Sequence, residues 1–196
     1  MTLDLKAADK ALLGLRAFPA AVTTIHDGRT NGLMSLSVAS CSIIYEAPRV
    51  SVGITQYNFT HDLILNSGVF VAHFLGNGDL LEKSLEILMT LGGSSGRDGE
   101  KLTNLSTKSG VTGAPILDDA LAYVEGRVFA SVDTQESTFF YPDVVNAEIQ
   151  HTNAARLNIA EAWSKLPKEW VETYEANHLA QTNSARRNRG LPEQDH

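Results

Sequence analysis

The chain has 196 residues with 43% hydrophobic residues, 20% charged residues and only 6 prolines. This length and composition are typical of one compact globular domain and exclude a disordered or fibrous chain. The formal net charge of -7 disfavours a nucleic-acid partner, which demands a strong positive field. No apolar run approaches the roughly 20 residues that span a bilayer, and the N-terminus shows no export signal. With a single cysteine, Cys41, we expect a cytoplasmic protein without a membrane partner.

Changes in composition along the chain predict three segments. We expect a main domain over residues 1–153, a helical extension over 154–182 and a polar, mobile tail over 183–196. Within the main domain, helical spacing of leucines predicts a short helix over 1–14. From Phe18 to Gln56, β-branched residues separated by turn residues predict three strands.

The middle strand of these three, "NGLMSLSVASCS", alternates between two faces. Apolar side chains occupy one face and small side chains the other: Met34, Leu36 and Val38 against Ser35, Ser37 and Ala39. Ser40 and Ser42 then occupy the face that had been apolar, which predicts a bulge or the end of the strand near Ala39. Periodicity alone favours an amphipathic strand with solvent-facing serines over a ligand groove.

The central part of the chain predicts alternating helices and strands. Thr60 is the predicted N-cap of a short helix, "HDLILN", which Gly68 ends. A strand, "VFVAHF", follows, and then a helix over residues 79–90. The small residues of "LGGSSGRDGE" at 91–100 predict a flexible loop.

Towards the C-terminus the sequence predicts two long strands, "ALAYVEGRVFASV" and "STFFYPDVVNAEI". Pro142 within the second strand indicates an edge position or a bulge. Asn153 is the predicted N-cap of a final long helix over 154–180, in which Pro167 marks a kink or a boundary.

Several classes of active site lack support. None of the six histidines has a second His or Cys at the spacing of a zinc site, so no metal site is expected. There is no Gly-x-Ser-x-Gly, no Walker phosphate loop and no dinucleotide glycine fingerprint after a strand. The remaining candidates are the hydroxyl-rich stretch Ser35 to Ser42 and the cations Arg97 and Lys101, for which a solvated loop is the simpler interpretation. Cys41 is expected to pack rather than react.

A succession of short motifs resembles a known family. The motifs are "FPAAVTTI" from Phe18, "NGLMSLSVASCS" from Asn31, Pro48, "SGVFVAHFL" from Ser67, "SGRDGEKL" from Ser95 and "GAPIL" from Gly113. Their order and spacing resemble the flavin-reductase-like FMN-binding split-barrel family, from about Ala11 to Ala147. The resemblance implies a mainly β fold with α-helices: a six-stranded, Greek-key-like split β-barrel with short helices and a long C-terminal helix.

The same resemblance implies a homodimer that holds FMN, or FAD in its place, near the subunit interface. By carry-over, the phosphate and ribityl side of the flavin is contacted by Met34, Ser35, Leu36 and Ser37. The isoalloxazine ring is faced by Ser40, Cys41 and Ser42. The phosphate is assisted by Asn58, Thr60 and Arg97 or Lys101.

The implied activity is hydride transfer from NADH or NADPH to the flavin, with reduced flavin passing to a flavin-dependent monooxygenase. No protein general base is required, and the sequence indicates no catalytic residue. The chain departs from the family pattern at Met34, where a threonine is frequent, and at Ser137, where a histidine is frequent. Ser137 favours the alternative of a non-catalytic FMN-binding protein for storage or sensing. A dimeric scaffold with a vestigial groove is the third possibility.

Overall fold

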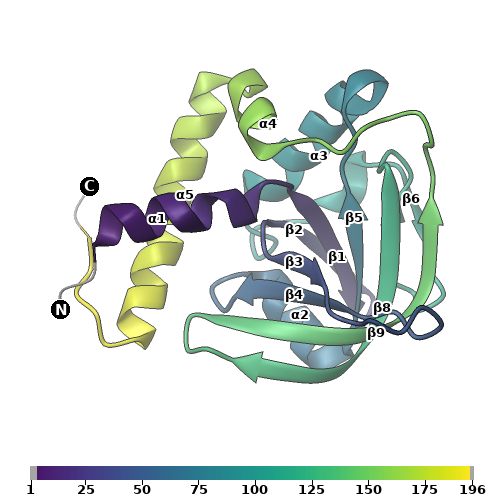
Figure 1. Cartoon of the computed structure of the whole chain (residues 1–196), viewed down its shortest axis with the longest axis horizontal. Coiled ribbons are helices and arrows are strands. Elements are labelled where there is room, and N and C mark those ends of the chain that lie inside the picture. The colour runs from purple at the N-terminus through teal and green to yellow at the C-terminus, as the bar shows by residue number, and fades with distance from the viewer. Residues whose placement is uncertain (1–3, 195–196) are drawn as a thin grey trace.

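The computed structural model describes residues 4–194 and combines one curved sheet with helices around it (Figure 1). The α-helices are α1 (Leu5–Leu13), α2 (Phe59–Ser67), α3 (Leu81–Gly92), α4 (Ile159–Lys165) and α5 (Lys168–Asn188). The strands are β1 (Ala20–His26), β2 (Arg29–Ser35), β3 (Val38–Ser40), β4 (Val50–Thr55), β5 (Val69–Phe74), β6 (Thr107–Ser109), β7 (Pro115–Leu117), β8 (Ala122–Asp133) and β9 (Ser137–Ile149). Short 3-10 turns cover Gly14–Arg16, Gly78–Leu80 and Leu102–Asn104.

The main sheet is antiparallel, with the strand order β2-β1-β5-β8-β9-β4-β3. Its two edge strands, β2 and β3, are joined only by Leu36 and Ser37, so the sheet must curl until its edges lie close together. The Ser35 hydroxyl crosses this seam and donates to the Gly53 carbonyl on β4 at 3.0 Å. The result is the expected split barrel.

The strand expected over "NGLMSLSVASCS" is divided in two by the seam. β2 pairs with β1 as far as Ser35, opposite Ala20, and β3 pairs with β4 from Val38 onward. The break therefore lies at Leu36 and Ser37, earlier than the predicted position near Ala39. Counting β2 and β3 as one strand gives the six strands that the family resemblance implies.

Alternating side chains give the sheet two apolar faces. On β1, Ala21 packs with Leu88 and Leu91 of α3 on the outside, and Val22 points into the barrel with Phe70 and Phe140. α2 closes the barrel interior with Ile64, which is 1% exposed. Burial on both faces positions β2 and α2 rigidly against one another.

A buried histidine joins three strands. His73 on β5 pairs through Nδ1 with the Ala21 carbonyl on β1 and accepts through Nε2 from the Leu117 amide on β7, both at 3.0 Å. Burial lowers the pKa of His73 from 6.5 to about 4. The neutral ring with its proton on Nδ1 satisfies both backbone groups.

The predicted helix starts need two corrections. α2 has Asn58 as its N-cap instead of Thr60, although Gly68 ends the helix as expected with a φ of 67°. Asn158, whose side chain accepts from the Ala160 amide, caps α4, and Asn153 caps no helix. Thr60 already lies in the first turn of α2, so the cap precedes it, whereas Asn153 stands several residues before α4; both true caps are asparagines with extended backbone directly before the helix.

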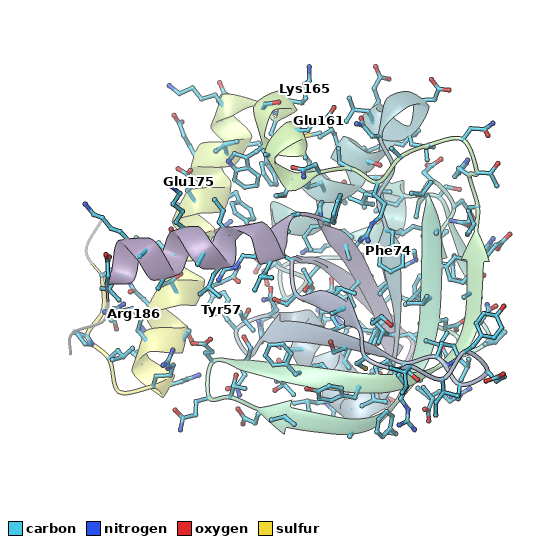
Figure 2. All side chains as sticks on the ribbon, viewed as in Figure 1. Tyr57, Phe74, Glu161, Lys165, Glu175 and Arg186 are labelled. Carbon is cyan, nitrogen blue, oxygen red and sulfur yellow. The ribbon has the colours of Figure 1, made fainter. Side chains whose placement is uncertain are left out.

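The C-terminal region forms two helices, and the helix boundary predicted at Pro167 is confirmed. Pro167 separates α4 from α5, and Figure 2 shows Glu161 and Lys165 of α4 on the side away from the sheet. α5 continues to Asn188, beyond the expected end of the helix, so residues 183–188 belong to a helix instead of a mobile tail. The Arg189 guanidinium pairs with Glu136 at 3.1 Å, which fixes this end of α5 to the barrel.

The long hairpin of β8 and β9 is confirmed, and Pro142 lies beside one of its two register shifts, between Val128 and Ala130. The expected bulge is therefore present, while β9 itself is an interior strand between β8 and β4. Among residues 4–194, no helix combines the length and apolarity needed to cross a membrane.

Candidate functional site

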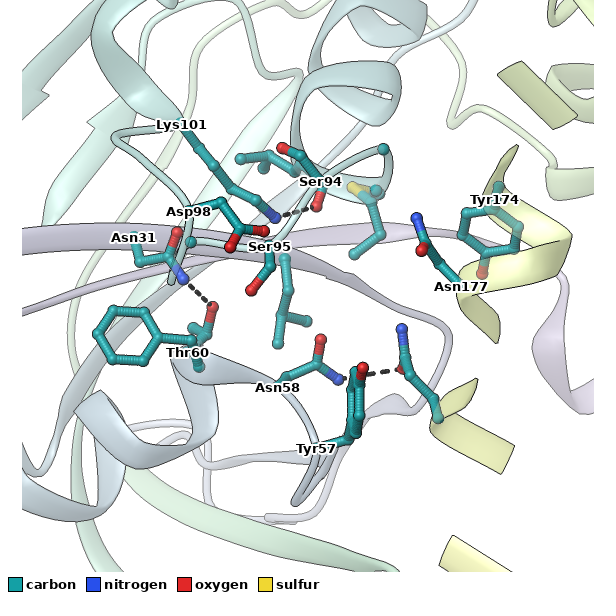
Figure 3. A pocket seen from close by; sticks show the side chains of 18 residues that line it. Asn31, Tyr57, Asn58, Thr60, Ser94, Ser95, Asp98, Lys101, Tyr174 and Asn177 are labelled. Carbon is teal, nitrogen blue, oxygen red and sulfur yellow. Dashed lines mark hydrogen bonds between the residues drawn. The ribbon is translucent and has the colours of Figure 1, made fainter. Parts of the chain in front are cut away.

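A polar cavity of about 360 Å³ opens between β2, the start of α2, the loop after α3 and one face of α5 (Figure 3). Four segments that are far apart in sequence therefore converge on it. Its lining consists of Asn31, Leu33, Met34, Tyr57, Asn58, Phe59, Thr60, Leu91, Gly92, Gly93, Ser94, Ser95, Gly96, Asp98, Lys101, Tyr174, Asn177 and Gln181.

The floor of the cavity is built from β2 and the first turn of α2. Asn31 on β2 donates through Nδ2 to the Thr60 hydroxyl at 3.0 Å. Its Oδ1 is buried and has no hydrogen-bond partner among the described residues. A buried, unpaired acceptor is costly in a folded protein. A ligand with a hydroxyl or N–H group would satisfy it.

The loop after α3 is held down on this floor. A side chain on Gly96 would collide with the Asn31 amide, so the close approach of the loop requires glycine. The Arg29 guanidinium donates to the Gly96 carbonyl at 2.8 Å and lies over the Phe59 ring at 4.2 Å. The loop expected to be flexible is thus tied to β2 and α2.

Arg97, one of the two predicted phosphate ligands, is engaged outside the cavity. Its guanidinium pairs with Asp62 at 2.7 Å, donates to the Tyr57 carbonyl at 2.9 Å and lies 5.4 Å from the Phe59 ring. Arg97 lines a neighbouring hollow with Gln56. These contacts hold the loop against α2.

Lys101, the other predicted phosphate ligand, is the one Lys or Arg among residues 4–194 that lines the cavity. Its ammonium donates to the Leu91 carbonyl at the end of α3 at 2.6 Å and to the Gly32 carbonyl at 3.3 Å. Burial lowers the pKa of Lys101 to about 8. An ammonium has three donors, so one remains for a ligand.

Asp98 also lines the cavity, and its carboxylate would repel an anion placed beside it. Lys101 and Thr60 are the lining residues suited to an anion, and Figure 3 shows Asp98 on the same side of the cavity as Lys101. At Thr60, the N-terminal amides of α2 add the positive end of a helix dipole.

An apolar hollow of about 260 Å³ adjoins the polar cavity and shares Met34, Gly92 and Tyr174 with it. Its other lining residues are Leu13, Arg16, Pro19, Leu36, Leu88, Ile159 and Trp163. The two spaces together run along the end of β2, polar at one end and apolar at the other. This gradient suits an elongated ligand with a phosphate at one end and a planar ring at the other.

The predicted site residues divide into three groups. Met34, Asn58, Thr60 and Lys101 line the polar cavity. Leu36 lines the apolar hollow, and with Ser37 it lines a further hollow beside β3.

The remaining predicted residues lie elsewhere. The Ser35 hydroxyl is used within the seam, where it also accepts from the Ser37 amide at 3.1 Å. Ser40, Cys41 and Ser42 lie outside the polar cavity, on β3 and the loop that follows, and Cys41 is exposed, so it is not a buried packing residue of the single chain.

Three parts of the cavity lining were not predicted from the sequence: Asn31, Asp98 and the residues of α5. Asn31 is the first residue of the predicted strand "NGLMSLSVASCS", but β2 already begins at Arg29, which places Asn31 inside the strand. The part played by Tyr174, Asn177 and Gln181 depends on how α5 folds back over the barrel, which no local pattern reveals. Within residues 4–194, no group of three or more His, Cys, Asp or Glu side chains is placed to hold a metal ion.

Comparison with known proteins identifies the family of this chain. The sequence model described as "Flavin reductase like domain" matches residues 15–162. The chain belongs to this family. α5 and the residues after it lie beyond the matched flavin reductase-like region.

Curated relatives in the family include reductases. The chain is 27% identical over 159 residues to the FMN reductase (NADH) RutF of Pseudomonas syringae pv. syringae, covering 81% of this chain and 85% of the relative. It is also 27% identical over 148 residues to the ferric-chelate reductase (NAD(P)H) of Archaeoglobus fulgidus, covering 75% of this chain and 82% of the relative.

Solved structures agree on the fold. An FMN-binding protein from Thermus thermophilus, solved with bound 1-cyclohex-2-enone, is 26% identical and superposes with a TM-score of 0.60 over 68% of this chain and 70% of its own. The flavin reductase HpaC complexed with NADP+ is 21% identical, with a TM-score of 0.60 over 81% of this chain and 99% of its own. The shared fold is the flavin reductase-like split barrel.

Proposed function

We propose that the protein is a flavin reductase that transfers a hydride from NADH or NADPH to FMN. The observation that carries the proposal is the space along the end of β2, polar around Lys101 and apolar around Leu36. FMN has the same division into an anionic phosphate and a largely apolar ring. The relationship to an FMN reductase (NADH) and a ferric-chelate reductase (NAD(P)H) supports the same conclusion.

The residues of the cavity fit FMN. The ammonium of Lys101 is half-buried with one donor unused, and a phosphate would compensate its desolvation. The buried Oδ1 of Asn31 accepts nothing from the described residues and would accept from a ligand hydroxyl. Thr60 and the amides at the start of α2 complete the phosphate end.

When bound, FMN supplies the redox chemistry by accepting a hydride on its ring. The protein residues bind and orient. Lys101 and Thr60 would hold the phosphate, and Met34 of β2 and the following Leu36 would contact the ring. The loop that Arg29 and Arg97 hold in place would form one wall of the flavin site.

We also propose that the protein is a homodimer and that reduced flavin passes to a flavin-dependent monooxygenase. Apolar side chains that a single chain leaves in solvent support the dimer, among them Ile43, which is 103% exposed, and Tyr45, which is 93% exposed. Ser40, Cys41 and Ser42 adjoin this exposed loop. We propose that they face the isoalloxazine ring where two protomers meet.

The test is a coupled oxidation assay. Purified protein is mixed with FMN or FAD, and oxidation of NADH or NADPH is followed by its near-ultraviolet absorbance. We expect oxidation that depends on both protein and flavin, faster with FMN than with FAD. Absence of oxidation by protein that binds FMN would contradict the reductase and select the non-catalytic FMN-binding alternative, which Ser137 favours.

A further inference from the structure

α5 lies outside the region matched by the family and yet lines the polar cavity. Tyr174, Asn177 and Gln181 are spaced by three and four residues, so they occupy one face of the helix. Figure 3 shows Tyr174 and Asn177 extending from this helix on the side of the cavity opposite Lys101. The helix thus contributes part of the lining that the family domain alone does not contain.

Contacts on both sides of the cavity hold α5 in this position. Near its start, the Trp170 indole N–H donates to the Met89 carbonyl of α3 at 3.2 Å, and its ring stacks on Tyr174 at 5.3 Å. Near its end, Asn188 donates to Gln56 after β4 at 3.4 Å. Together with the ion pair of Arg189 and Glu136, these contacts make α5 a bridge from α3 to the far side of the barrel.

The chemistry of the α5 face differs from that of the Lys101 side. Asn177 and Gln181 offer carboxamides, which both donate and accept hydrogen bonds but carry no charge. The Gln181 Oε1 receives long hydrogen bonds of 3.4 Å from the Asn58 amide and the Thr55 hydroxyl. Carboxamides in a row suit neutral hydroxyls, which also both donate and accept.

We propose that α5 is a specificity-determining part of the flavin site, in which Asn177 and Gln181 bind the ribityl hydroxyls. This inference rests on the proposed function, because it takes the flavin phosphate to lie at Lys101. The polyol chain connects the phosphate to the ring, so it passes between the Lys101 side and the apolar hollow. Both α5 carboxamides line the cavity through which it would pass.

The experiment uses the full chain and three flavin probes that differ in the ribityl part. FMN has phosphate and ribityl, riboflavin has ribityl alone, and lumiflavin has neither. Quenching of flavin fluorescence gives Kd for each probe with the wild type and with Asn177→Leu and Gln181→Leu. We expect each variant to bind FMN and riboflavin about tenfold more weakly, because one or two hydrogen bonds are lost. The affinity for lumiflavin should stay unchanged.

Asn183→Leu is the matched control, because it makes the same change in α5 at a residue outside the cavity lining. Its affinities should equal those of the wild type. Tryptophan fluorescence reports whether α5 stays docked, since Trp170 packs between α5 and α3. Asn177 makes no side-chain hydrogen bond to another described residue, so Asn177→Leu tests the contact without disturbing the helix.

The outcomes separate the two proposals. Unchanged FMN and riboflavin affinity in both variants, with a wild type that binds FMN, would overturn the role of α5 and leave the proposed function standing. Equal losses for all three flavins would also overturn it, because α5 would then act by packing alone. A wild type that binds no flavin would overturn the proposed function and this inference with it.

Discussion

Lys101 is the residue on which the phosphate end of the site depends. It is far enough from water that its pKa falls to about 8, and its two hydrogen bonds go to backbone carbonyls instead of a carboxylate. A cation held in this way is destabilising by itself and gains from an anionic ligand. The free protein thus carries a charge whose natural counterion is the ligand.

Replacing this cation should separate FMN from riboflavin. We expect Lys101→Met to bind FMN ten- to a hundredfold more weakly than the wild type. This loss corresponds to the about 1.5–3 kcal/mol that a hydrogen bond to a charged group contributes. Riboflavin affinity should stay within about twofold of the wild type. Titration of both flavins by fluorescence checks this, and Arg97→Met is the comparison because its guanidinium pairs with Asp62 outside the cavity. A larger FMN-specific loss in Arg97→Met than in Lys101→Met would contradict the assignment.

The lowered pKa of Lys101 also predicts a pH dependence. Below about pH 8 the amine of the free protein is protonated and can pair with phosphate; above it, binding must also take up a proton. FMN affinity should therefore fall as pH rises through about 8, by up to tenfold per unit. Riboflavin titrations over the same pH range are the control, and a parallel fall for riboflavin would contradict this explanation.

At the scale of elements, His73 links β1, β5 and β7, and its burial makes that link sensitive to acid. The folded protein holds His73 with a pKa of about 4, below the 6.5 of an exposed ring, so the unfolded chain binds the proton more readily. The stabilising contribution of the neutral ring is present above pH 6.5 and is lost as pH falls towards 4.

We expect the free energy of unfolding to fall by about 3 kcal/mol across this interval. His73→Gln, which cannot titrate, should lack this part of the pH dependence. Denaturant unfolding at pH 7, 6, 5 and 4 measures it. Identical pH profiles for the two proteins would show that other groups dominate acid unfolding.

Elements with a strong local pattern could be predicted from the sequence, and those set by distant contacts could not. β5 lies at the predicted "VFVAHF", and Gly68 ends α2 as its left-handed backbone requires. The three-residue strands β6 and β7 escaped prediction because so few residues cannot display an alternation. The true caps Asn58 and Asn158 each lie beside other polar residues that satisfy the same local rule.

The candidate site was predicted in part for the same reason. The motif succession placed Met34, Asn58, Thr60 and Lys101 at one cavity, and the structure brings them together. Arg97 carried the same local signal as Lys101, but Asp62 and the Tyr57 carbonyl engage it outside. Only tertiary structure distinguishes two cations that are four residues apart in one loop.

At the scale of the whole molecule, the single chain leaves large apolar side chains in solvent at two places, the loop after β3 and the region of α1. They include Ile43 and Tyr45 in the loop after β3, and Leu5 and Leu15 near α1, which are 73% and 77% exposed. Exposed apolar side chains that gather in one patch mark an interaction site. We propose that a second copy of the chain buries these side chains.

Charges placed in this loop should separate the protomers. We expect the wild type to sediment as a dimer in sedimentation velocity and the double variant Ile43→Asp with Tyr45→Asp to sediment as a monomer. Circular dichroism should stay unchanged, because these side chains make no core contacts in the single chain. FMN affinity should also fall if the neighbouring Ser40 and Ser42 contact the ring across the interface. If the variant remained dimeric, this result would show that the dimer interface does not include Ile43 and Tyr45.

The seam at Leu36 and Ser37 has a further effect on the sheet that contains it. Because these two residues tie the two outermost strands together, neither strand can swing out to recruit a strand from another molecule. β3, with three residues, is also too short a strand to pair stably with a strand of another molecule. The connection that divides β2 from β3 beside the proposed ligand therefore also protects the sheet from edge-to-edge aggregation.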